Sequence, residues 1–289
     1  MADLPFTDTH VHFWDLRESE LRYAWLEPDW MHPVLGDHGA IKSVRYWADD
    51  FIAETRQANV ERVVHVQAAI GSEDPVSETS WLQQFTDRTG APHGIVAYVD
   101  LGGDEVESTV ERHAQFDALR GIRDLRYDDY LTDERWRKGY AALAGRGLVF
   151  CDDPLLEVMD DAVALAARFP QITYCVDHAG WPRERGEEYF KAWRTKMRAL
   201  AAQPNTVVKI SGLGMSDRAW TVASLRPWVL ECIDAWGTER AFFGTNWPVD
   251  RLFSSYSELI DAYAAIIADF TLAERMALFN ANANRIFRL

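Results

Sequence analysis

Two histidines near the start of the chain, His10 and His12, stand one residue apart in a short run of β-branched and aromatic residues. In a β-strand, residues two apart point to the same side, so both imidazoles are expected to face one volume. A metal ion or a polar substrate group needs such a shared volume. Asp8 has the same parity one step earlier, where a carboxylate could orient a histidine through its second ring nitrogen. The alternative is a pair of ordinary strand histidines beside a carboxylate whose hydrogen bonds are already satisfied. The residues of the later strands distinguish the two interpretations.

Polar residues also end the later extended segments of the sequence. They are Arg123, Asp124, Arg126, Cys151, Asp152, His178, Lys209, Ser211, Thr245 and Asn246. In a parallel barrel, functional groups gather at the carboxyl ends of the strands. We therefore expect these side chains to surround one site together with the two histidines.

Two arginines follow the fourth extended segment, and each has two interpretations. Arg123 and Arg126 either bind an anionic group of the substrate or form ion pairs at the rim with nearby aspartates such as Asp124. Because Arg123 stands at a strand end before a loop, we favour substrate binding for it. Lys209, at the end of the seventh segment, either contacts the substrate or is paired, since a lysine inside a barrel is costly otherwise.

Two further residues of these strand ends are interpreted as structural. Asp177 alternates with His178, so if the histidine faces the barrel axis, the aspartate is expected to face the helices. Cys151 is interpreted as a packed thiol, because no neighbouring group is expected to lower its pKa.

Extended apolar segments alternate with amphipathic helical ones along the chain. The predicted strands are Phe6–Phe13, Arg62–Gln67, Gly94–Leu101, Leu119–Leu125, Leu148–Cys151, Ile172–His178, Val207–Ser211 and Ala241–Asn246. The predicted helices are Ala48–Ala58, Glu78–Arg88, Glu105–Ala114, Glu134–Gly145, Leu155–Arg168, Glu187–Ala202, Trp220–Trp236 and Ser257–Phe270. This alternation predicts an α/β fold, a (β/α)8 TIM barrel. A doubly wound sheet is the runner-up, weakened because no glycine-rich phosphate fingerprint follows the first strand.

We expect residues 1–289 to form a single barrel domain, because no repeat, low-complexity tract or linker divides the chain. The stretch 16–46 is long and aromatic, with Trp25, Pro28, Trp30, Pro33 and Gly36. It is interpreted as a loop elaboration over the mouth of the barrel.

Composition limits the partners and the compartment. The 289 residues are 48% hydrophobic, which is typical of globular proteins, and the net charge of −15 disfavours nucleic acid and anionic membranes. A small-molecule substrate is compatible with that charge, and a homodimer is left open. We expect a cytoplasmic protein, since neither a secretory leader nor an apolar run long enough for a bilayer is present. Three scattered cysteines argue against a disulfide framework or a cysteine-rich zinc module.

The motifs of these strand ends, taken in order, resemble the amidohydrolase superfamily. They are Asp-Thr-His-Val-His-Phe-Trp-Asp (8–15), Tyr-Ala-Trp-Leu (23–26), Gly-Ile-Arg (121–123), Val-Asp-His-Ala-Gly-Trp-Pro (176–182), Lys-Ile-Ser-Gly-Leu (209–213) and Phe-Gly-Thr-Asn-Trp-Pro-Val-Asp (243–250). The pattern is similar to the amidohydrolase-2 branch, which holds sugar-lactone, muconolactone and pyrone-dicarboxylate lactonases. Each motif alone is weak, whereas six in sequence are specific. The resemblance implies a (β/α)8 barrel that hydrolyses a cyclic ester.

The resemblance also implies roles for individual residues. His10, His12 and His178 would hold one divalent metal, zinc or manganese, or would polarise the lactone carbonyl in a metal-independent enzyme. Arg123, and less directly Arg126, would bind a carboxylate or hydroxyl group of the substrate, and Lys209 matches a lysine of the family without a settled role. Two metals are not expected, because the fourth strand has no lysine for a bridging carboxylate and no histidine ends the fifth.

Asn246 departs from the family pattern, which has an aspartate that takes the proton from the attacking water. An amide has no basic lone pair at neutral pH, so Asn246 orients a water or weakly ligates a metal but does not accept a proton. Three accounts are open. Another group, with His178 or Asp250 nearest in sequence, serves as the base; a metal acidifies the water enough for a weak base; or the reaction is not a standard hydrolysis.

The leading hypothesis is a lactonase with a catalytic set of His178, Asn246, His10 and His12. Trp14, Trp25 and Trp30 of the aromatic loop would stack against the substrate ring and exclude water. Trp181 and Trp247 either line the same pocket or pack under loops. The alternatives are a metal-dependent decarboxylase of an aromatic or muconate-type acid, and a ligand-binding barrel that has lost hydrolysis through Asn246.

Overall fold

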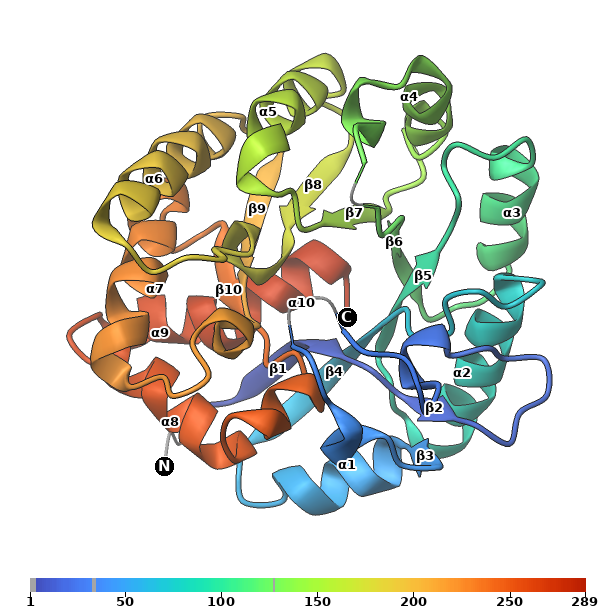
Figure 1. The fold of residues 1–289 in the computed structure, drawn as a ribbon, viewed down its shortest axis with the longest axis horizontal. Coiled ribbons are helices and arrows are strands. Elements are labelled where there is room, and N and C mark those ends of the chain that lie inside the picture. Colours follow the sequence, from blue (N-terminus) through green and yellow to red (C-terminus); the bar gives the residue numbers. More distant parts are fainter. Residues whose placement is uncertain (1–3, 33–34, 127) are drawn as a thin grey trace.

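Eight parallel strands form the centre of the computed structural model, which describes residues 4–32, 35–126 and 128–289. Their order in the sheet is β1-β4-β5-β6-β7-β8-β9-β10, so each barrel strand pairs with the next along the chain (Figure 1). The strands are β1 (Phe6–Val11), β4 (Val60–Val66), β5 (Gly94–Tyr98), β6 (Leu119–Arg123), β7 (Val149–Asp152), β8 (Thr173–Val176), β9 (Thr206–Ile210) and β10 (Ala241–Phe243). All eight predicted strands are confirmed, and with them the predicted barrel.

The barrel is closed at its carboxyl end by the segments that follow β1 and β10. Val11 pairs with Trp247 in a parallel bridge. The amide of His12 donates to the carbonyl of Trp247 at 2.8 Å, and the amide of Trp247 donates to the carbonyl of His10 at 3.1 Å. This seam brings the two predicted histidines of the first strand next to Asn246, although more than two hundred residues separate them in the chain.

The helices surround the barrel (Figure 1). The eight predicted helices are present as α1 (Ala48–Thr55), α2 (Val76–Thr89), α3 (Val106–His113), α4 (Glu134–Ala141), α5 (Met159–Arg168), α6 (Glu187–Ala201), α7 (Val222–Trp236) and α8 (Tyr256–Ile266). Two helices that the sequence patterns did not indicate follow them, α9 (Leu272–Met276) and α10 (Asn282–Phe287). The last of these contributes Phe287 to the barrel interior, where its ring lies 5.9 Å from that of Phe242.

The barrel interior contains one cluster of buried apolar side chains. Its members come from the strands and from α10: Val64, Val66, Val96, Val149, Cys151, Cys175, Val207, Phe242, Ala283 and Phe287. The parallel register places Cys151 directly beside Cys175 on neighbouring strands. Because these positions are apolar and fully packed, the barrel is a core and not a channel, and the space for chemistry lies at its carboxyl end.

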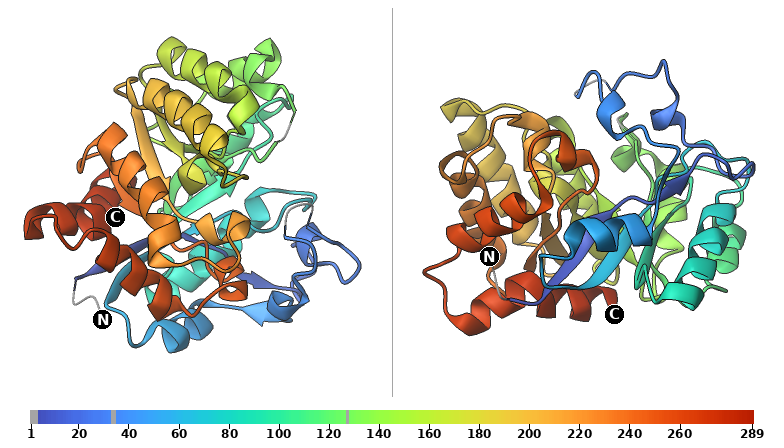
Figure 2. Two further views of the ribbon diagram at one scale, coloured as in Figure 1. Left: turned by 60° about the vertical axis from the view of Figure 1, so that its left-hand side comes forward. Right: turned by 90° about the horizontal axis from the view of Figure 1, so that it is seen from below.

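The segment 16–46 lies at the end of the barrel opposite α10 (Figure 2). It starts and ends on a small antiparallel ribbon that the sequence patterns did not indicate, β2 (Trp14–Asp15) with β3 (Arg45–Tyr46). Between them run two short 3-10 turns, Ala24–Leu26 and Gly39–Ile41. Pro33, one of the residues named for this loop, lies outside the described residues.

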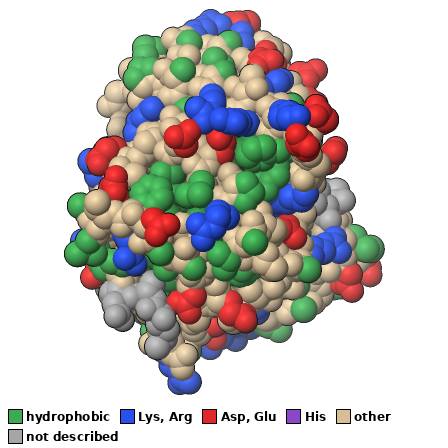
Figure 3. All heavy atoms as spheres, turned by 90° about the vertical axis from the view of Figure 1, so that its left-hand side faces the viewer, with side chains coloured by type: hydrophobic (Ala, Val, Ile, Leu, Met, Phe, Trp, Pro, Cys, Tyr) green, Lys and Arg blue, Asp and Glu red, His purple; other side chains and the backbone are tan. Residues whose placement is uncertain are grey.

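The surface carries charges of both signs. On the face shown in Figure 3, acidic and basic side chains are interspersed with small apolar areas. Within the described residues, the structure contains no helix whose length and apolar character would let it cross a membrane.

Candidate active site

A cavity of about 230 Å³ lies at the carboxyl end of the barrel. Six of the predicted site residues line it: His12, Trp25, Trp30, Arg123, His178 and Asn246. They lie just after β1, in the aromatic loop, in β6, just after β8 and in the segment after β10. The expected convergence of these strand ends is therefore present in the structure.

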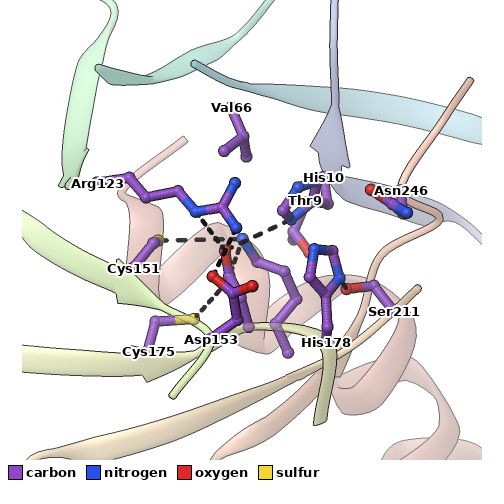
Figure 4. A network of polar contacts seen from close by, with 12 residues as sticks. Thr9, His10, Val66, Arg123, Cys151, Asp153, Cys175, His178, Ser211 and Asn246 are labelled. Carbon is purple, nitrogen blue, oxygen red and sulfur yellow. Dashed lines mark hydrogen bonds and ion pairs between the residues drawn. The ribbon is translucent and has the colours of Figure 1, made fainter. Parts of the chain in front are cut away.

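The three predicted histidines lie close together beside this cavity, and Figure 4 shows two of them, His10 and His178. The ring centroids of His10 and His12 are 5.0 Å apart, and those of His10 and His178 are 4.4 Å apart. Nδ1 of His12 lies 2.9 Å from the carbonyl oxygen of Val66. A carbonyl only accepts, so the neutral ring carries its proton on Nδ1 and leaves a lone pair on Nε2. Nδ1 of His178 is held in a similar way, 2.9 Å from the hydroxyl of Ser211.

Burial keeps these histidines neutral. Desolvation lowers the pKa of His12 to about 3, with further lowering by the charge of Arg123. The pKa values of His10 and His178 are also lowered, first by burial and then by neighbouring positive charges. Neutral imidazole is the form that ligates a metal, whereas a histidine with so low a pKa is a weak proton acceptor.

Three neutral imidazoles have the chemistry to hold one divalent ion, but among the described residues their ligand nitrogens do not all lie within 4.8 Å of one another. Among the described residues, neither buried ring nitrogen of His10 has a hydrogen-bond partner, although Nδ1 lies 3.5 Å from Oδ2 of Asp177. Buried nitrogens without hydrogen bonds are costly unless a ligand occupies the site. His12 and His178 are each oriented through Nδ1 by an outer oxygen, as metal-binding histidines usually are. In the part of the chain that the structure describes, the one group with three ligand atoms within 4.8 Å of one another is Cys151, Cys175 and Asp177. That group already has a cation, the ammonium group of Lys209.

Asn246 is held in place by a buried carboxylate. Its backbone has a positive φ of 60°, which asparagine tolerates better than most residues. Its Nδ2 donates to Oδ2 of Asp250 at 2.7 Å. Burial raises the pKa of Asp250 to about 7, although the bond from Asn246 opposes the rise. Since the amide nitrogen faces Asp250, the amide oxygen is left to face His12. It raises the pKa of His12 because it accepts a hydrogen bond from Nε2 only when the ring is protonated.

Asp177 lies inside the barrel, so the prediction that it faces the helices is wrong. Its Oδ1 is 2.8 Å from Nζ of Lys209, and its Oδ2 is 3.5 Å from Nδ1 of His10. The strand alternation behind that prediction ends at Val176, because His178 adopts a left-handed conformation with φ 53°. Asp177 and His178 consequently face the same side, and the carboxylate supports the histidine cluster from below the cavity.

Lys209 and Arg126 are paired away from the cavity. Lys209 is fully buried and balances the charge of Asp177, which is the second of its two predicted fates. Arg126 contacts Asp100 and Asp124, with Nε 3.0 Å from Oδ2 of Asp124. It therefore forms the rim ion pair that was the alternative to substrate binding.

Arg123 faces the cavity but brings its own counter-ion. Its Nη2 donates to Oδ1 of Asp153 at 2.7 Å, and both side chains are buried. Burial raises the pKa of Asp153, and the charge of Arg123 opposes the rise. Asp152, the residue chosen from the sequence, instead accepts hydrogen bonds from Tyr130 and Tyr174. The carboxylate beside the cavity is thus one residue further along than predicted.

The tryptophans divide between the cavity wall and its support. Trp25 and Trp181 line the cavity. Trp14 is fully buried, with its ring 5.5 Å from that of Trp25 and its indole N–H bonded to Ser43. The prediction that Trp14 stacks on the substrate is corrected accordingly, because it packs behind the wall. Trp247 is likewise buried and packs under the site.

Asp8 does not orient a histidine ring. Its carboxylate accepts from the backbone amide of Thr245 at 3.0 Å, from the hydroxyl of the same residue, and from Tyr256 at 3.0 Å. These bonds join β1 to the segment after β10. Asp8 therefore fixes the seam of the barrel and positions the histidines only through the backbone.

Comparison with known proteins gives the family of the chain. The model of the amidohydrolase family matches residues 7–289. The chain belongs to this family. An uncharacterized protein from Sinorhizobium fredii is 36% identical, over the full length of both chains. An L-fucono-1,5-lactonase from Burkholderia ambifaria is 28% identical, across 98% of this chain and 95% of the lactonase.

A solved structure extends the likeness to three dimensions. The crystal structure of an amidohydrolase from Burkholderia multivorans with bound zinc is 26% identical and gives a TM-score of 0.84. The superposition covers 98% of this chain and 99% of that one. The family and the barrel that the sequence motifs indicated are confirmed.

Sequence reasoning missed several residues of this amidohydrolase that line the cavity. Asp153 was passed over for its neighbour, and Gln67 was seen only as the end of a predicted strand. His32 and His38 of the aromatic loop also line the cavity, beside Trp30, which the sequence had indicated. Gln67 could have been predicted by the rule that indicated the other site residues, since it is a polar residue at the carboxyl end of a barrel strand.

Proposed function

We propose that this amidohydrolase is a lactonase that opens the cyclic ester of a sugar acid. The observation that carries the proposal is the convergence of neutral His12, neutral His178 and the clamped amide of Asn246 on one small cavity. The full-length similarity to an L-fucono-1,5-lactonase supports the same reaction class. The cavity volume suits a single small ring.

The charge balance of the cavity favours a neutral, hydroxylated ring over a di-acid. Arg123 would attract a carboxylate if it were alone, but Asp153 neutralises it at 2.7 Å. An anionic substrate would have to displace that carboxylate or lie beside it, at a cost in repulsion. A hydroxyl group, by contrast, donates to Asp153 and accepts from Arg123 without disturbing the pair. Sugar lactones are therefore preferred here over muconolactone or pyrone-dicarboxylate substrates.

The residues of the chain would prepare the reaction as follows. Trp25 and Trp181 enclose the ring, and the Arg123–Asp153 pair fixes its orientation. The amide oxygen of Asn246 accepts a hydrogen bond from the attacking water. Asp250 accepts a hydrogen bond from the amide nitrogen, which polarises the amide and makes its oxygen a stronger acceptor. Restricting water and ring in this way lowers the entropic part of the barrier.

Two sources of activation are compatible with these contacts. A divalent ion held by His10, His12 and His178 would polarise the carbonyl and acidify the water. In a metal-independent reaction, the proton acceptor would be Nε2 of His12, because the Val66 carbonyl keeps the ring proton on Nδ1; it would be a weak base, since burial lowers the pKa of this ring to about 3. Asp250 is not the direct acceptor in this proposal, since it lies behind Asn246 and is bonded to it.

The test is proton release from sugar lactones and muconolactone by the purified protein, followed with a pH indicator with and without a chelator. We expect hydrolysis of sugar lactones in preference to muconolactone. Loss of activity with the chelator, restored by zinc or manganese, identifies the metal-dependent route, whereas activity that survives chelation identifies His12. Release of carbon dioxide from benzoate-type acids without lactone hydrolysis would replace the proposal by the decarboxylase alternative. Tight binding of lactones without turnover would replace it by the ligand-binding barrel.

A further inference from the structure

Gln67 is a buried amide at the edge of the cavity, and its side chain has no hydrogen-bond partner among the residues that the structure describes. It follows β4 directly, its backbone amide donates to the carbonyl of Val96 at 2.8 Å, and its side chain lines the cavity. Only 2% of the residue is exposed. Neither Oε1 nor Nε2 forms a hydrogen bond with any described residue. Such a side chain combines a donor and an acceptor that both await a ligand.

Keeping this amide unbonded is unfavourable for the free protein. Polar groups buried without partners destabilise a fold, and the great majority of buried polar atoms in native proteins are therefore bonded. Leucine would fill nearly the same volume without that cost. A glutamine at this position is thus explained by what it does in the complex and not by what it adds to the fold.

The position of Gln67 relative to the reacting groups is well defined. The preceding residue, Val66, provides the carbonyl that fixes the ring of His12. The following residue, Ala68, accepts the indole N–H of Trp25 at 2.8 Å and so ties the aromatic loop to the same strand end. Gln67 therefore lies between an anchored site histidine and the anchored loop, where a bound ring would be enclosed on both sides.

We propose that Gln67 reads a hydroxyl group of the substrate ring, with Nε2 donating to it or Oε1 accepting from it. Together with the Arg123–Asp153 pair, it gives a mostly apolar cavity two separate polar contacts, the arrangement by which small pockets select their ligands. Gln67 is a specificity-determining residue for hydroxylated rings. The inference rests on the proposed lactonase function for the identity of the ring, but not for the presence of the polar contact.

The experiment compares the wild-type protein with Gln67→Leu, using two probes, L-fucono-1,5-lactone and δ-valerolactone, which lacks every ring hydroxyl. We expect the wild-type protein to favour the hydroxylated lactone in kcat/KM. Gln67→Leu should reduce that preference at least about tenfold, mainly through the hydroxylated substrate. The free variant should also melt about 2 °C higher than the wild type, because an unsatisfied buried amide has been removed. Gln171→Leu, the same substitution at an exposed position, is the matched control and should change neither quantity.

A structural role for Gln67 predicts the opposite pattern. If the side chain supports the fold, Gln67→Leu melts several degrees lower and retains the wild-type preference, and the inference is overturned. An unchanged melting temperature with an unchanged preference also overturns it. Should the leucine variant fail to fold, Gln67→Met keeps the unbranched length of the side chain and is judged by the same two measurements.

The outcomes separate this inference from the proposed function. If neither lactone is hydrolysed, the lactonase proposal fails, and the increase in melting temperature on adding L-fucono-1,5-lactone becomes the readout. A ligand-induced increase in the wild type that is lost in Gln67→Leu supports hydroxyl reading without hydrolysis. The absence of any such increase in the wild type overturns both.

Discussion

Replacing Asn246 by aspartate is the most direct test of the hydrogen bond that holds Asn246 against the buried carboxylate of Asp250. In the wild type, Nδ2 of Asn246 donates to Oδ2 of Asp250 at 2.7 Å, and both residues are buried. Asn246→Asp places two carboxylates at that distance. Two unit charges 2.7 Å apart repel by about 6 kcal/mol at an effective dielectric constant of about 20. At about 1.4 kcal/mol per pKa unit, this raises the upper pKa of the pair by about four units.

The pair in the variant therefore keeps one proton well above neutral pH, whereas the unfolded chain, whose carboxyl groups have pKa values near 3.8, does not. Because the folded state binds the extra proton, stability falls as the pH rises. Between pH 7.5 and pH 9.0 the variant should lose about 2 kcal/mol of unfolding free energy through this proton. The wild-type protein loses little over this interval, since Asp250, with its pKa raised by burial to about 7, is already ionised.

Denaturant unfolding at the two pH values measures this difference. Asn246→Ser is the control, because it removes the amide without adding a second carboxyl group and should keep the wild-type pH slope. If the unfolding free energy of Asn246→Asp changed with pH just as that of the wild type does, the two carboxylates would not share a proton. The close contact between residue 246 and Asp250 would then be refuted.

Three further predictions concern His178 and the buried charged groups. His178→Ala should lower kcat/KM by on the order of 100-fold or more while changing the melting temperature little, and a large loss of stability with retained lactone hydrolysis would contradict the site assignment. Arg123→Ala should reduce kcat/KM for sugar lactones, whereas Arg126→Ala, which lies in the rim ion pair, should leave steady-state kinetics unchanged; equal effects would contradict the different positions of the two arginines. Lys209→Met should destabilise the protein by about 3–5 kcal/mol in urea unfolding, because it leaves the buried carboxylate of Asp177 without its cation. Adding Asp177→Asn should recover part of that loss, and a double variant less stable than the single one would contradict the pairing.

The barrel and much of the site could be predicted because they depend on local periodicity. Alternation along β1 was enough to place His10 and His12 around one volume, and the position of Asn246 after the last strand placed it near them. The family motifs added the order of the strands. These features persist as long as the backbone remains extended, so a pattern in the sequence translates directly into a direction in space.

The errors arose where the backbone stops being extended. Asp177 follows the last residue of β8, and the left-handed turn at His178 reverses the alternation that the prediction assumed. Asp153 lies just past β7 and was passed over for Asp152 for the same reason. Trp14 was misplaced for a different cause, since the sequence does not show which of several tryptophans forms a wall and which supports it. Such choices depend on tertiary packing.

The seam between Val11 and Trp247 also determines at which stage of synthesis and folding the site forms. The bond from Thr245 to Asp8 closes a loop of 237 residues, and contacts of such long range form late in folding. A growing chain therefore carries His10 and His12 through most of its synthesis without Asn246 beside them. Only when the last barrel strand has left the ribosome are the histidines, the amide and the cavity wall assembled together, so a prematurely terminated chain would retain the histidine motif and lack the site.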